Sequence, residues 1–207
     1  MRRLGRGDRL VVATHNAGKL AEIAALLAPW GIETLGAGAL GLAEPAEDAP
    51  DFAGNARIKA LAAARGAGLP ALADDSGFCV AALGGAPGVV SARWAGPERD
   101  FGLAMARVAR EMGEAADPGA WFVCVLCLAF PDGENLCFSG RVDGAVRFPP
   151  SGGQGFGYDP IFVPAGETRS FGEMAPAEKE AISHRTQAFR AFAAACLAPI
   201  PEPGGMA

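Results

Sequence analysis

The sequence of 207 residues predicts a mixed α/β fold built around a central sheet. The first observation is a strand, a polar turn and a helix in direct succession. Apolar Leu10–Thr14 is typical of a buried strand, and apolar residues recur at helical spacing across Lys19–Trp30. The second is a meander of strand-like segments in mid-chain, Trp121–Phe130, Asn135–Gly140 and Arg141–Phe148. Interleaved helices and strands indicate an α/β protein, and the meander makes its sheet mixed rather than purely parallel.

The remaining elements follow the same patterns. Alanines at helical spacing predict a helix over Phe52–Ala64, which follows a loop-rich, acidic segment over Gly36–Pro50. We also expect strands at Pro70–Ala73, Phe78–Leu83 and Ile161–Val163, and helices at Asp100–Glu114 and Ala175–Leu197, the last as one helix or a pair. Polar turns that contain glycine separate these elements, and at the ends of the sheet they leave room for a cleft.

The composition narrows the class of protein. The formal net charge is −5, from 18 Lys and Arg against 23 Asp and Glu. Proteins that bind duplexes are usually basic, so we expect no nucleic-acid partner, while nucleotides stay open. Met1–Asp8 lacks the apolar stretch of a signal peptide, and the longest apolar run, Trp121–Phe130, is too short to span a bilayer. We therefore expect no membrane partner.

The five cysteines favour a reducing, cytoplasmic setting, because their number is odd and a chain of this length needs no disulfide framework. Cys124 and Cys127 have the C-x-x-C spacing, but they fall inside the predicted strand Trp121–Phe130. Side chains three apart on a strand point to opposite faces, and no second pair of ligands follows at zinc spacing. We expect the two cysteines to pack in the core.

The first candidate site is the turn Thr14–Lys19, which joins a strand to a helix. The free N–H groups and the dipole of a helix N-terminus suit a phosphate. Lys19 adds a cation in the first turn, where it opposes the dipole, and a bound anion would explain its presence. The spacing of a P-loop is absent. An ordinary capped junction of strand and helix is the alternative.

Carboxylates gather at two places and indicate a metal. Asp74 and Asp75 follow an apolar strand, where adjacent side chains point to opposite faces, so one can hold Mg²⁺ while the other supports the backbone or a cation. An acidic loop offers a second carboxylate, from Glu44, Glu47, Asp48 or Asp51. An Asp-rich turn and a solvated acidic loop are the respective alternatives.

Polar residues on predicted helices offer cations and donors. Asn55 and Lys59 are four apart on one helix face, and they either line a phosphate cleft or lie in solvent. Lys179 and Ser183–Arg185 supply donors that suit the 6-keto oxygen and N7 of a purine. Adenine carries a 6-amino group instead and would leave such donors unmatched. Basic residues placed near a helix C-terminus for the dipole are the alternative.

The glycine-rich segment Gly155–Pro160 is the last candidate. Its glycines allow a close approach, the face of Phe156 can stack on a base, and Asp159 can accept hydrogen bonds from ring N–H groups. The alternative is a glycine-rich turn whose aromatic residues pack in the core.

In their order along the chain these motifs closely resemble the inosine triphosphate pyrophosphatase family, which acts on non-standard purine nucleoside triphosphates. The resemblance covers about residues 9–197. It is carried by Thr14-x-Asn16-x-x-Lys19, Phe52-x-x-Asn55-Ala56-x-x-Lys59-Ala60, Ala73-Asp74-Asp75-Ser76-Gly77, Gly84-Gly85-Ala86-Pro87-Gly88 with Ser91-Ala92-Arg93, Gly155-Phe156-Gly157-Tyr158-Asp159-Pro160, and Ser183-His184-Arg185.

The resemblance implies the architecture and the reaction. The fold would be mixed α/β, with a long twisted central sheet flanked by helices and two lobes around a substrate cleft. Residues 1–198 would form a single domain and the protein a homodimer. The sequence itself predicts a disordered tail over residues 199–207. The implied activity is hydrolysis of ITP, dITP and XTP to the monophosphate and pyrophosphate, which cleanses the nucleotide pool.

The resemblance also implies residue roles. Asp75 would be the catalytic carboxylate and, with Glu47, a ligand of Mg²⁺. The residues implied to bind substrate are Thr14, His15, Asn16, Ala17, Gly18, Lys19, Lys59, Ser76, Phe156, Gly157, Tyr158, Asp159, Lys179, His184 and Arg185. Of these, the residues up to Lys59 would hold the triphosphate and Ser76 would touch the substrate. The residues from Phe156 onward would stack on the base, line its pocket and read its 6-keto edge.

The chain departs from the family pattern in places. His15 stands where the family often has glycine, and Gly54 where glutamate is common. Asp48-Ala49-Pro50 replaces a segment that is often Glu-Thr-Gly, so either Glu47 or Asp48 could be the second metal ligand. Two other functions stay open: a related pyrophosphatase with another base preference, and a nucleotide sensor that binds without cleaving.

Overall fold

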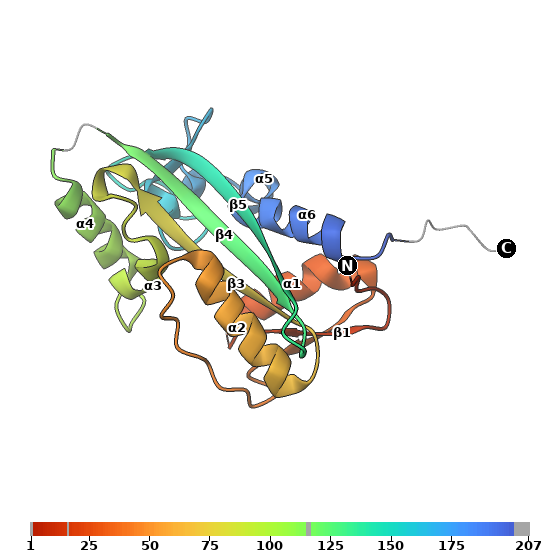
Figure 1. Ribbon diagram of the computed structural model, residues 1–207. Coiled ribbons are helices and arrows are strands. Elements are labelled where there is room, and N and C mark those ends of the chain that lie inside the picture. The colour runs from red at the N-terminus through yellow and green to blue at the C-terminus, as the bar shows by residue number, and fades with distance from the viewer. Residues whose placement is uncertain (1, 16, 115–116, 201–207) are drawn as a thin grey trace. The chain divides into compact units, whose positions relative to one another are not determined.

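The structure is a computed structural model that describes residues 2–15, 17–114 and 117–200. The described strands form one six-stranded sheet in the order β2-β1-β3-β4-β5-β6 (Figure 1). They are β1 Arg9–Val12, β2 Glu33–Gly36, β3 Ala71–Val80, β4 Gly119–Ala129, β5 Asn135–Val146 and β6 Phe162–Pro164. Because β1 pairs in parallel with β2 and β3, whereas β5 pairs antiparallel with β6, the predicted mixed sheet is confirmed.

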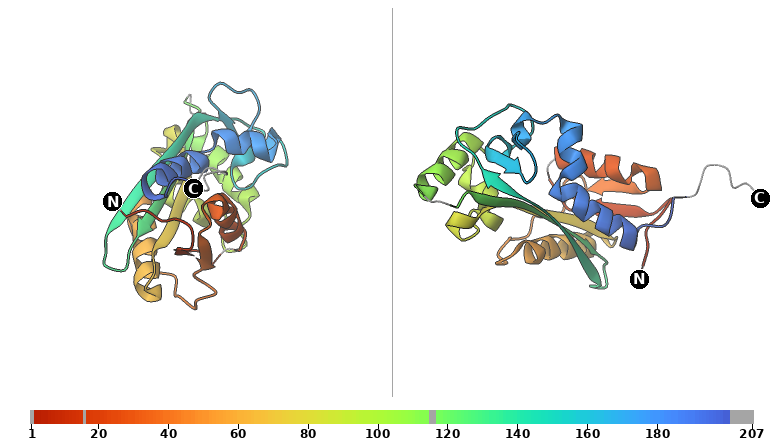
Figure 2. Two further views of the ribbon diagram at one scale, coloured as in Figure 1. Left: turned by 90° about the vertical axis from the view of Figure 1, so that its right-hand side faces the viewer. Right: turned by 90° about the horizontal axis from the view of Figure 1, so that it is seen from above.

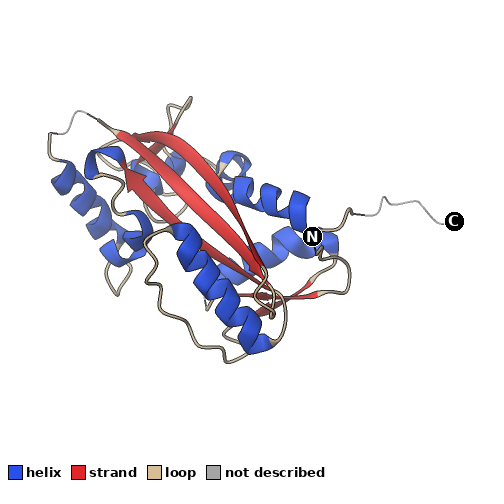
Figure 3. Ribbon diagram, viewed as in Figure 1, coloured by secondary structure: helices blue, strands red, loops and turns tan. Residues whose placement is uncertain are grey.

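Helices lie between most of the strands along the chain and also follow the last strand. Figure 3 colours the helices blue and the strands red. The α-helices are α1 Ala17–Leu27, α2 Phe52–Ala67, α3 Ser91–Trp94, α4 Phe101–Met112, α5 Pro176–Ile182 and α6 His184–Cys196. Short 3-10 helices are η1 Ala28–Trp30, η2 Ala81–Leu83, η3 Gly88–Val90, η4 Asp159–Ile161 and η5 Phe171–Glu173. The predicted strand, turn and helix at the N-terminal end are thus β1 and α1, and the predicted C-terminal helix is a pair.

The strand predictions required three corrections. We expected two strands, Pro70–Ala73 and Phe78–Leu83, but β3 is one strand, Ala71–Val80, that runs through Asp74–Gly77, and Ala81–Leu83 forms η2. We expected two strands from Asn135 to Phe148, and the structure has β5 alone. We assigned no element to Glu33–Leu35 and placed Gly36 in a loop, whereas Glu33–Gly36 forms β2, which pairs with β1. In each case pairing with a neighbouring strand outweighs the local polar or glycine signal.

The chain divides into two compact units, which we describe separately. The first unit comprises Met1–Asp74, Leu126–Phe138 and Phe189–Ala207, and the second comprises Asp75–Val125 and Ser139–Ala188. In the first unit Leu4 pairs with Leu197, so the N-terminal segment lies beside the end of α6 (Figure 2). The fully buried side chains of this unit include Leu10, Leu27 and Phe192.

The second unit has an aromatic core. Phe78 contacts Tyr158 at 4.9 Å and Phe122 at 5.0 Å between ring centroids. Phe162 and Phe171 are fully buried in the same cluster. Stacked and tilted rings of this kind add attraction beyond the apolar area that they bury. The core therefore gives the loops of this unit a rigid base.

None of the described helices is both long and apolar enough to cross a membrane. The predicted tail falls largely outside the described residues, which end at residue 200.

Candidate active site

Lys19 and Asp74 form an ion pair in the first unit. The Nζ atom of Lys19 lies 3.0 Å from Oδ2 and 3.2 Å from Oδ1 of Asp74. Lys19 stands in the first turn of α1 and Asp74 on β3, and the parallel pairing of β1 with β3 brings the two elements together. The Asp74 side chain is 6% exposed and that of Lys19 is 38% exposed. Asp74 thus holds the partly exposed Lys19 cation at the N-terminus of α1. One of the two aspartates was predicted to support the backbone or a cation.

Two hydrogen bonds fasten the acidic loop to α2. The buried Asn55 accepts one at Oδ1 from the N–H of Ala49, at 3.0 Å. Asp51 caps the helix, since its Oδ1 accepts from the N–H of Gly54 at 2.7 Å. A solvated Asn55, the alternative left open by the sequence, is wrong. Asp51 has a structural role at the helix end.

Lys59 lies one turn along α2 from Asn55 and pairs with Glu47. Its Nζ atom is 2.9 Å from Oε1 of Glu47, with 16% of the lysine side chain and 35% of the glutamate side chain exposed. Asp48, the other candidate ligand, is exposed. The loop therefore presents Glu47, rather than Asp48, beside a cation.

Asp75 and Ser76 lie on β3 and not in a turn, so the alternative of an Asp-rich turn is wrong. Successive side chains of a strand point to opposite faces. Asp75 consequently faces away from the side on which Asp74 meets Lys19, as the sequence predicted. Asp75 is buried and Ser76 half-buried. The two aspartates, adjacent in the chain, are thus separated in orientation.

Asp159 and Lys179 form a buried ion pair in the second unit. The Nζ atom of Lys179 lies 2.5 Å from Oδ2 of Asp159, and the same oxygen accepts the N–H of Phe156 at 2.8 Å. Burial raises the pKa of the Asp159 carboxyl, and the Lys179 charge opposes that effect. Asp159 has only 2% of its surface exposed, so its carboxylate accepts hydrogen bonds from Lys179 and from the Phe156 backbone within the protein.

Gly155 makes this turn possible. Its φ is +74°, and a Cβ atom at this position would lie 2.1 Å from Oδ2 of Asp159. Only glycine tolerates both the left-handed backbone and the close approach. The close approach that the glycines were predicted to allow is therefore between the Gly155 backbone and the Asp159 carboxylate of the same segment.

Phe156 is 60% exposed, which excludes the alternative that it packs in the core. Two cations lie near its ring: Lys179 Nζ is 4.6 Å from the ring centroid, and Arg185 Cζ is 5.8 Å from it. Both distances are within the range of cation–π attraction. The segment thus offers an open aromatic face with positive charge beside it.

His184 and Arg185 begin α6, and Ser183 separates this helix from α5. They also directly follow the C-terminal end of α5, and Lys179 stands in the last turn of that helix, so a role at a helix C-terminus stays an alternative. The His184 ring is buried and stacks on Phe122, with centroids 5.0 Å apart and planes 9° apart. Its orientation is therefore fixed by an aromatic residue of β4, far away in sequence.

The remaining predicted residues lie in the segment after Phe156 and in the turn before Lys19. Tyr158 is buried, stacks on Phe78 and donates from its hydroxyl to the Ser91 carbonyl at 2.9 Å, whereas Gly157 is a turn residue with a φ of +69°. Thr14 is half-buried and His15 is exposed, with its ring beside Gly38. Asn16 lies outside the described residues, and the side chains of Ala17 and Gly18 are likewise not described.

Sequence reasoning missed the residues that orient the site. Phe122 under His184 and the Ala49 N–H that anchors Asn55 had no local signal, because each depends on a contact between separate elements. The described residues contain no group of three or more His, Cys, Asp or Glu side chains that could hold a metal by themselves.

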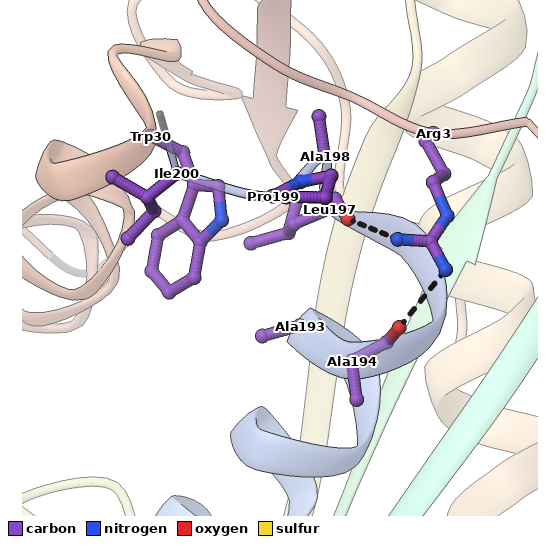
Figure 4. Close-up of a pocket in the computed structure, with 8 residues that line it drawn as sticks. All are labelled: Arg3, Trp30, Ala193, Ala194, Leu197, Ala198, Pro199 and Ile200. Atoms are coloured by element: carbon purple, nitrogen blue, oxygen red, sulfur yellow. Dashed lines mark hydrogen bonds between the residues drawn. The ribbon is translucent and has the colours of Figure 1, made fainter. Parts of the chain in front are cut away.

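A shallow apolar hollow of about 340 Å³ lies elsewhere in the first unit (Figure 4). Arg3 borders it and donates to the carbonyls of Leu197 and Ala194, at 2.9 and 3.4 Å. Trp30 and Ile200 line its apolar side. It contains none of the predicted site residues, so we do not assign the site to it.

The fold and these two clusters define a class: an α/β enzyme with paired cations and carboxylates in one unit and an open aromatic ring flanked by cations in the other. The sequence comparison agrees with this class. The model of the Ham1 family matches residues 10–195. The chain belongs to the Ham1 family.

Curated relatives share half or more of their residues with the chain. A protein of Gluconobacter oxydans named dITP/XTP pyrophosphatase is 57% identical over 197 residues, which cover 95% of each chain. A protein of the same name from Rhodospirillum centenum is 55% identical, over 93% of this chain and 96% of its own. A solved HAM1 protein of Coxiella burnetii superposes with a TM-score of 0.85 at 39% identity, covering 90% of this chain and 97% of that one.

Proposed function

We propose that this chain hydrolyses non-standard purine nucleoside triphosphates, such as dITP, ITP and XTP, to the monophosphate and pyrophosphate. The observation that carries the proposal is the exposed Phe156 ring beside Lys179, which Asp159 holds in place. An open ring with a fixed cation next to it suits a base that carries acceptors on its edge. Membership of the Ham1 family supplies the reaction class.

We assign the triphosphate to the cations of the first unit. The ammonium of Lys19 stands at the N-terminus of α1, where free backbone N–H groups also favour an anion. Lys59 adds a second cation from α2. Thr14, His15, Asn16, Ala17 and Gly18 are assigned to the same role on the family resemblance, and Ser76 to a substrate contact.

We assign the base to the residues around Phe156. Its ring would stack on the purine, and Gly157 and Tyr158 would shape the turn that carries it. Lys179, His184 and Arg185 would donate to the 6-keto oxygen and to N7. An adenine would present its 6-amino group to these donors and leave them unmatched, which rejects the wrong base strongly.

We propose Mg²⁺ as the cofactor, held by Glu47 and Asp75. Their carboxylate oxygens are the hard donors that Mg²⁺ prefers, and one or two carboxylates suffice when substrate phosphates and waters complete the shell. This fits a chain whose described residues lack a ready-made cluster of three metal ligands. Bound Mg²⁺ would supply positive charge that neutralises phosphate oxygens and acidifies nearby water.

Asp75 is the proposed proton acceptor. A water attacks the α-phosphorus in line, Asp75 takes a proton from it, and the bond from the α-phosphorus to the bridging oxygen breaks. Pyrophosphate leaves with its developing charge stabilised by Lys19 and Lys59. The products are the nucleoside monophosphate and pyrophosphate.

Separation of the products tests this reaction. ITP is incubated with the full chain and Mg²⁺, and the nucleotides are resolved by anion exchange. We expect IMP and pyrophosphate in equal amounts. IDP with inorganic phosphate would place the cleavage at the other phosphate bridge, and tight binding without any product would identify a nucleotide sensor instead.

We further propose that the enzyme is a cytoplasmic homodimer, as the family resemblance and the odd number of cysteines support. Light scattering coupled to gel filtration should give twice the chain mass of 21.1 kDa. A mass of one chain at micromolar concentration would contradict the dimer.

A further inference from the structure

Cys127 and Cys137 lie on neighbouring strands, β4 and β5, within the first unit. The strands are joined by a short turn, so they run antiparallel. At that turn the N–H of Phe130 donates to the Glu134 carbonyl at 2.9 Å, and the N–H of Gly133 donates to the Phe130 carbonyl at 3.0 Å. These bonds set the register of the hairpin.

The register places the two cysteines directly opposite each other. Phe130 donates to the Glu134 carbonyl and accepts from Gly133, so Phe130 faces Glu134 across a one-residue bulge at Gly133. Three steps away from the turn along each strand, Cys127 faces Cys137. Bonded and non-bonded pairs alternate, which makes this a non-hydrogen-bonded pair. The Cα atoms of such a pair are about 4.5 Å apart, and a disulfide spans about 4.4 to 6.8 Å. The backbone is therefore already placed for a cross-strand disulfide.

The surroundings favour a thiolate on Cys137. Asn135 and Cys137 share one face of β5, and Arg57 of α2 reaches that face, where its Nε donates to Oδ1 of Asn135 at 3.0 Å. The hydrogen bond from the Cys127 thiol lowers the pKa of the Cys137 thiol, as does Arg57, against burial and the Asp51 carboxylate, which raise it. Cys137 is also half-buried rather than fully buried.

The other cysteines differ. The pKa of Cys127 is raised by its hydrogen bond to Cys137 and by burial, so it holds the proton of the pair. Burial raises the pKa of Cys79 to about 11 and also raises that of Cys196. Because the thiolate is the reactive form, these thiols are the slower ones.

We propose that Cys137 and Cys127 are a peroxide-responsive thiol pair that closes to a reversible disulfide across β4 and β5. The C-x-x-C spacing that drew attention to Cys127 is thus incidental, since its partner is Cys137 on the next strand and not Cys124. The proposal concerns the hairpin and does not depend on the hydrolytic reaction.

The chemistry takes two steps and consumes one hydroperoxide. The Cys137 thiolate attacks the peroxide, an S–O bond forms as the O–O bond breaks, and the sulfur becomes a sulfenic acid while the peroxide is reduced to an alcohol or water. The Cys127 sulfur then attacks the Cys137 sulfur, the S–S bond forms, and hydroxide leaves with the Cys127 proton as water. A dithiol reductant reverses the oxidation.

Peptide mapping tests the proposal on the full chain. The reduced protein is treated with hydrogen peroxide, remaining thiols are alkylated, and a protease that cuts after glutamate is used because Glu134 lies between the two cysteines. We expect the peptides with Cys127 and Cys137 to be joined, and to separate on reduction. Peroxide-treated wild type with no such link would overturn the proposal.

Variants identify the partner. Cys124 shares the protease fragment with Cys127, so Cys124→Ser must keep the link and Cys127→Ser must lose it. In Cys127→Ser a sulfenic acid at Cys137 should be trapped by dimedone, and Cys79→Ser should behave as wild type. A link that survives in Cys127→Ser would refute the pairing, as would dimedone labelling at Cys79 in place of Cys137.

A rate measurement checks the thiolate without any change to the cysteines. Arg57→Gln should slow the alkylation of Cys137 at neutral pH about threefold to tenfold, because it removes the cation beside the thiolate. Arg65→Gln, an exposed arginine on the same helix, is the matched control and should leave the rate unchanged. Equal rates in wild type and Arg57→Gln would contradict the assigned role of Arg57.

Discussion

Asp74 and Asp75 are consecutive residues with different surroundings. This difference assigns the positioning of a cation to one and the acceptance of a proton to the other, which the motif alone does not do. Asp74 is occupied by Lys19 at 3.0 Å, which makes it the residue that positions a cation. Asp75 is on the opposite face of β3. The proposed proton acceptor is accordingly Asp75.

Matched substitutions distinguish the two aspartates. Asp75→Asn should lower kcat for ITP by about 100-fold or more at saturating Mg²⁺ and substrate, because the amide cannot accept the proton. Asp74→Asn should mainly raise KM, because it releases the Lys19 side chain that is assigned to ground-state phosphate binding. Steady-state kinetics measures the split, and near wild-type turnover in Asp75→Asn would disprove its role.

A glycine pair tests the turn before Asp159. Gly155→Ala should destabilise the chain by about 1–2 kcal/mol from the left-handed backbone alone, and the added Cβ would also press on Asp159, with a contact at 2.1 Å. Gly153 has no atom within 4 Å of such a Cβ and no left-handed φ, so Gly153→Ala is the control. Thermal unfolding of the two variants should differ, and equal midpoints would show that the turn tolerates a side chain.

Arg185 gives a test of base selection that leaves the buried Asp159–Lys179 pair intact. Arg185→Gln should reduce the preference for ITP over ATP, as a ratio of kcat/KM, by about tenfold through the loss of one charged donor. Arg190→Gln, exposed on the same helix, should not change the ratio. An unchanged ratio in Arg185→Gln would remove that residue from the base site.

At the scale of elements, the first turn of α5 is held by a single glutamate. Glu178 accepts the N–H of Ala175 at 2.9 Å and pairs with Arg169 at 3.1 Å. These contacts, that of Arg169 foremost, hold the pKa of Glu178 below its ordinary value. Lys179 follows directly on the same helix, so the capped turn also supports the residue assigned to the base.

The contacts of Glu178 should make the free energy of unfolding depend on pH in the acidic range. Because the folded pKa of Glu178 is lowered, its contribution is present above the ordinary value of 4.5 and is lost as the pH falls through the folded value. Glu178→Gln should therefore be less stable than wild type at neutral pH, with the difference shrinking below pH 4.5. Denaturant unfolding measures it, and Glu180→Gln is the matched control on α5. A difference that does not change with pH would refute the argument.

Elements whose signal lies within their own segment could be predicted from the sequence, whereas strands that depend on a distant partner could not. Amphipathic spacing was enough for α1, α2 and α4, and the turn after β4 was recognisable from Pro131–Glu134. β2 was missed because its four residues become a strand only by pairing with β1. β3 was divided because Asp74–Gly77 has the local composition of a turn, which the neighbouring strands override.

The same distinction applies to the site. The residue types and their order were sufficient to nominate Lys19, Asp159 and Lys179, whereas their partners required the fold. Lys19 and Asp74 are 55 positions apart, and so no spacing rule could pair them. The pairing of Cys127 with Cys137 is different, because both residues are a few positions from the predicted turn and the register of the hairpin places them opposite each other.

At the scale of the whole molecule, the residues assigned to the triphosphate and those assigned to the base belong to different units. Lys19, Lys59 and Glu47 belong to the first unit, and Phe156, Lys179 and Arg185 to the second. The chain passes from one unit to the other between Asp74 and Asp75, and so the proposed proton acceptor directly follows the residue that positions Lys19. A triphosphate without a matching base should accordingly be a poor substrate.

The most direct test of this account is pyrophosphate release from ITP, XTP, GTP, ATP and dTTP, each with Mg²⁺ and with EDTA. We predict fast release from ITP and XTP, slow release from ATP, and none in EDTA. Fast release from dTTP would preserve the chemistry and contradict the base site. No release from any of the five, with binding intact, would contradict the hydrolytic function itself.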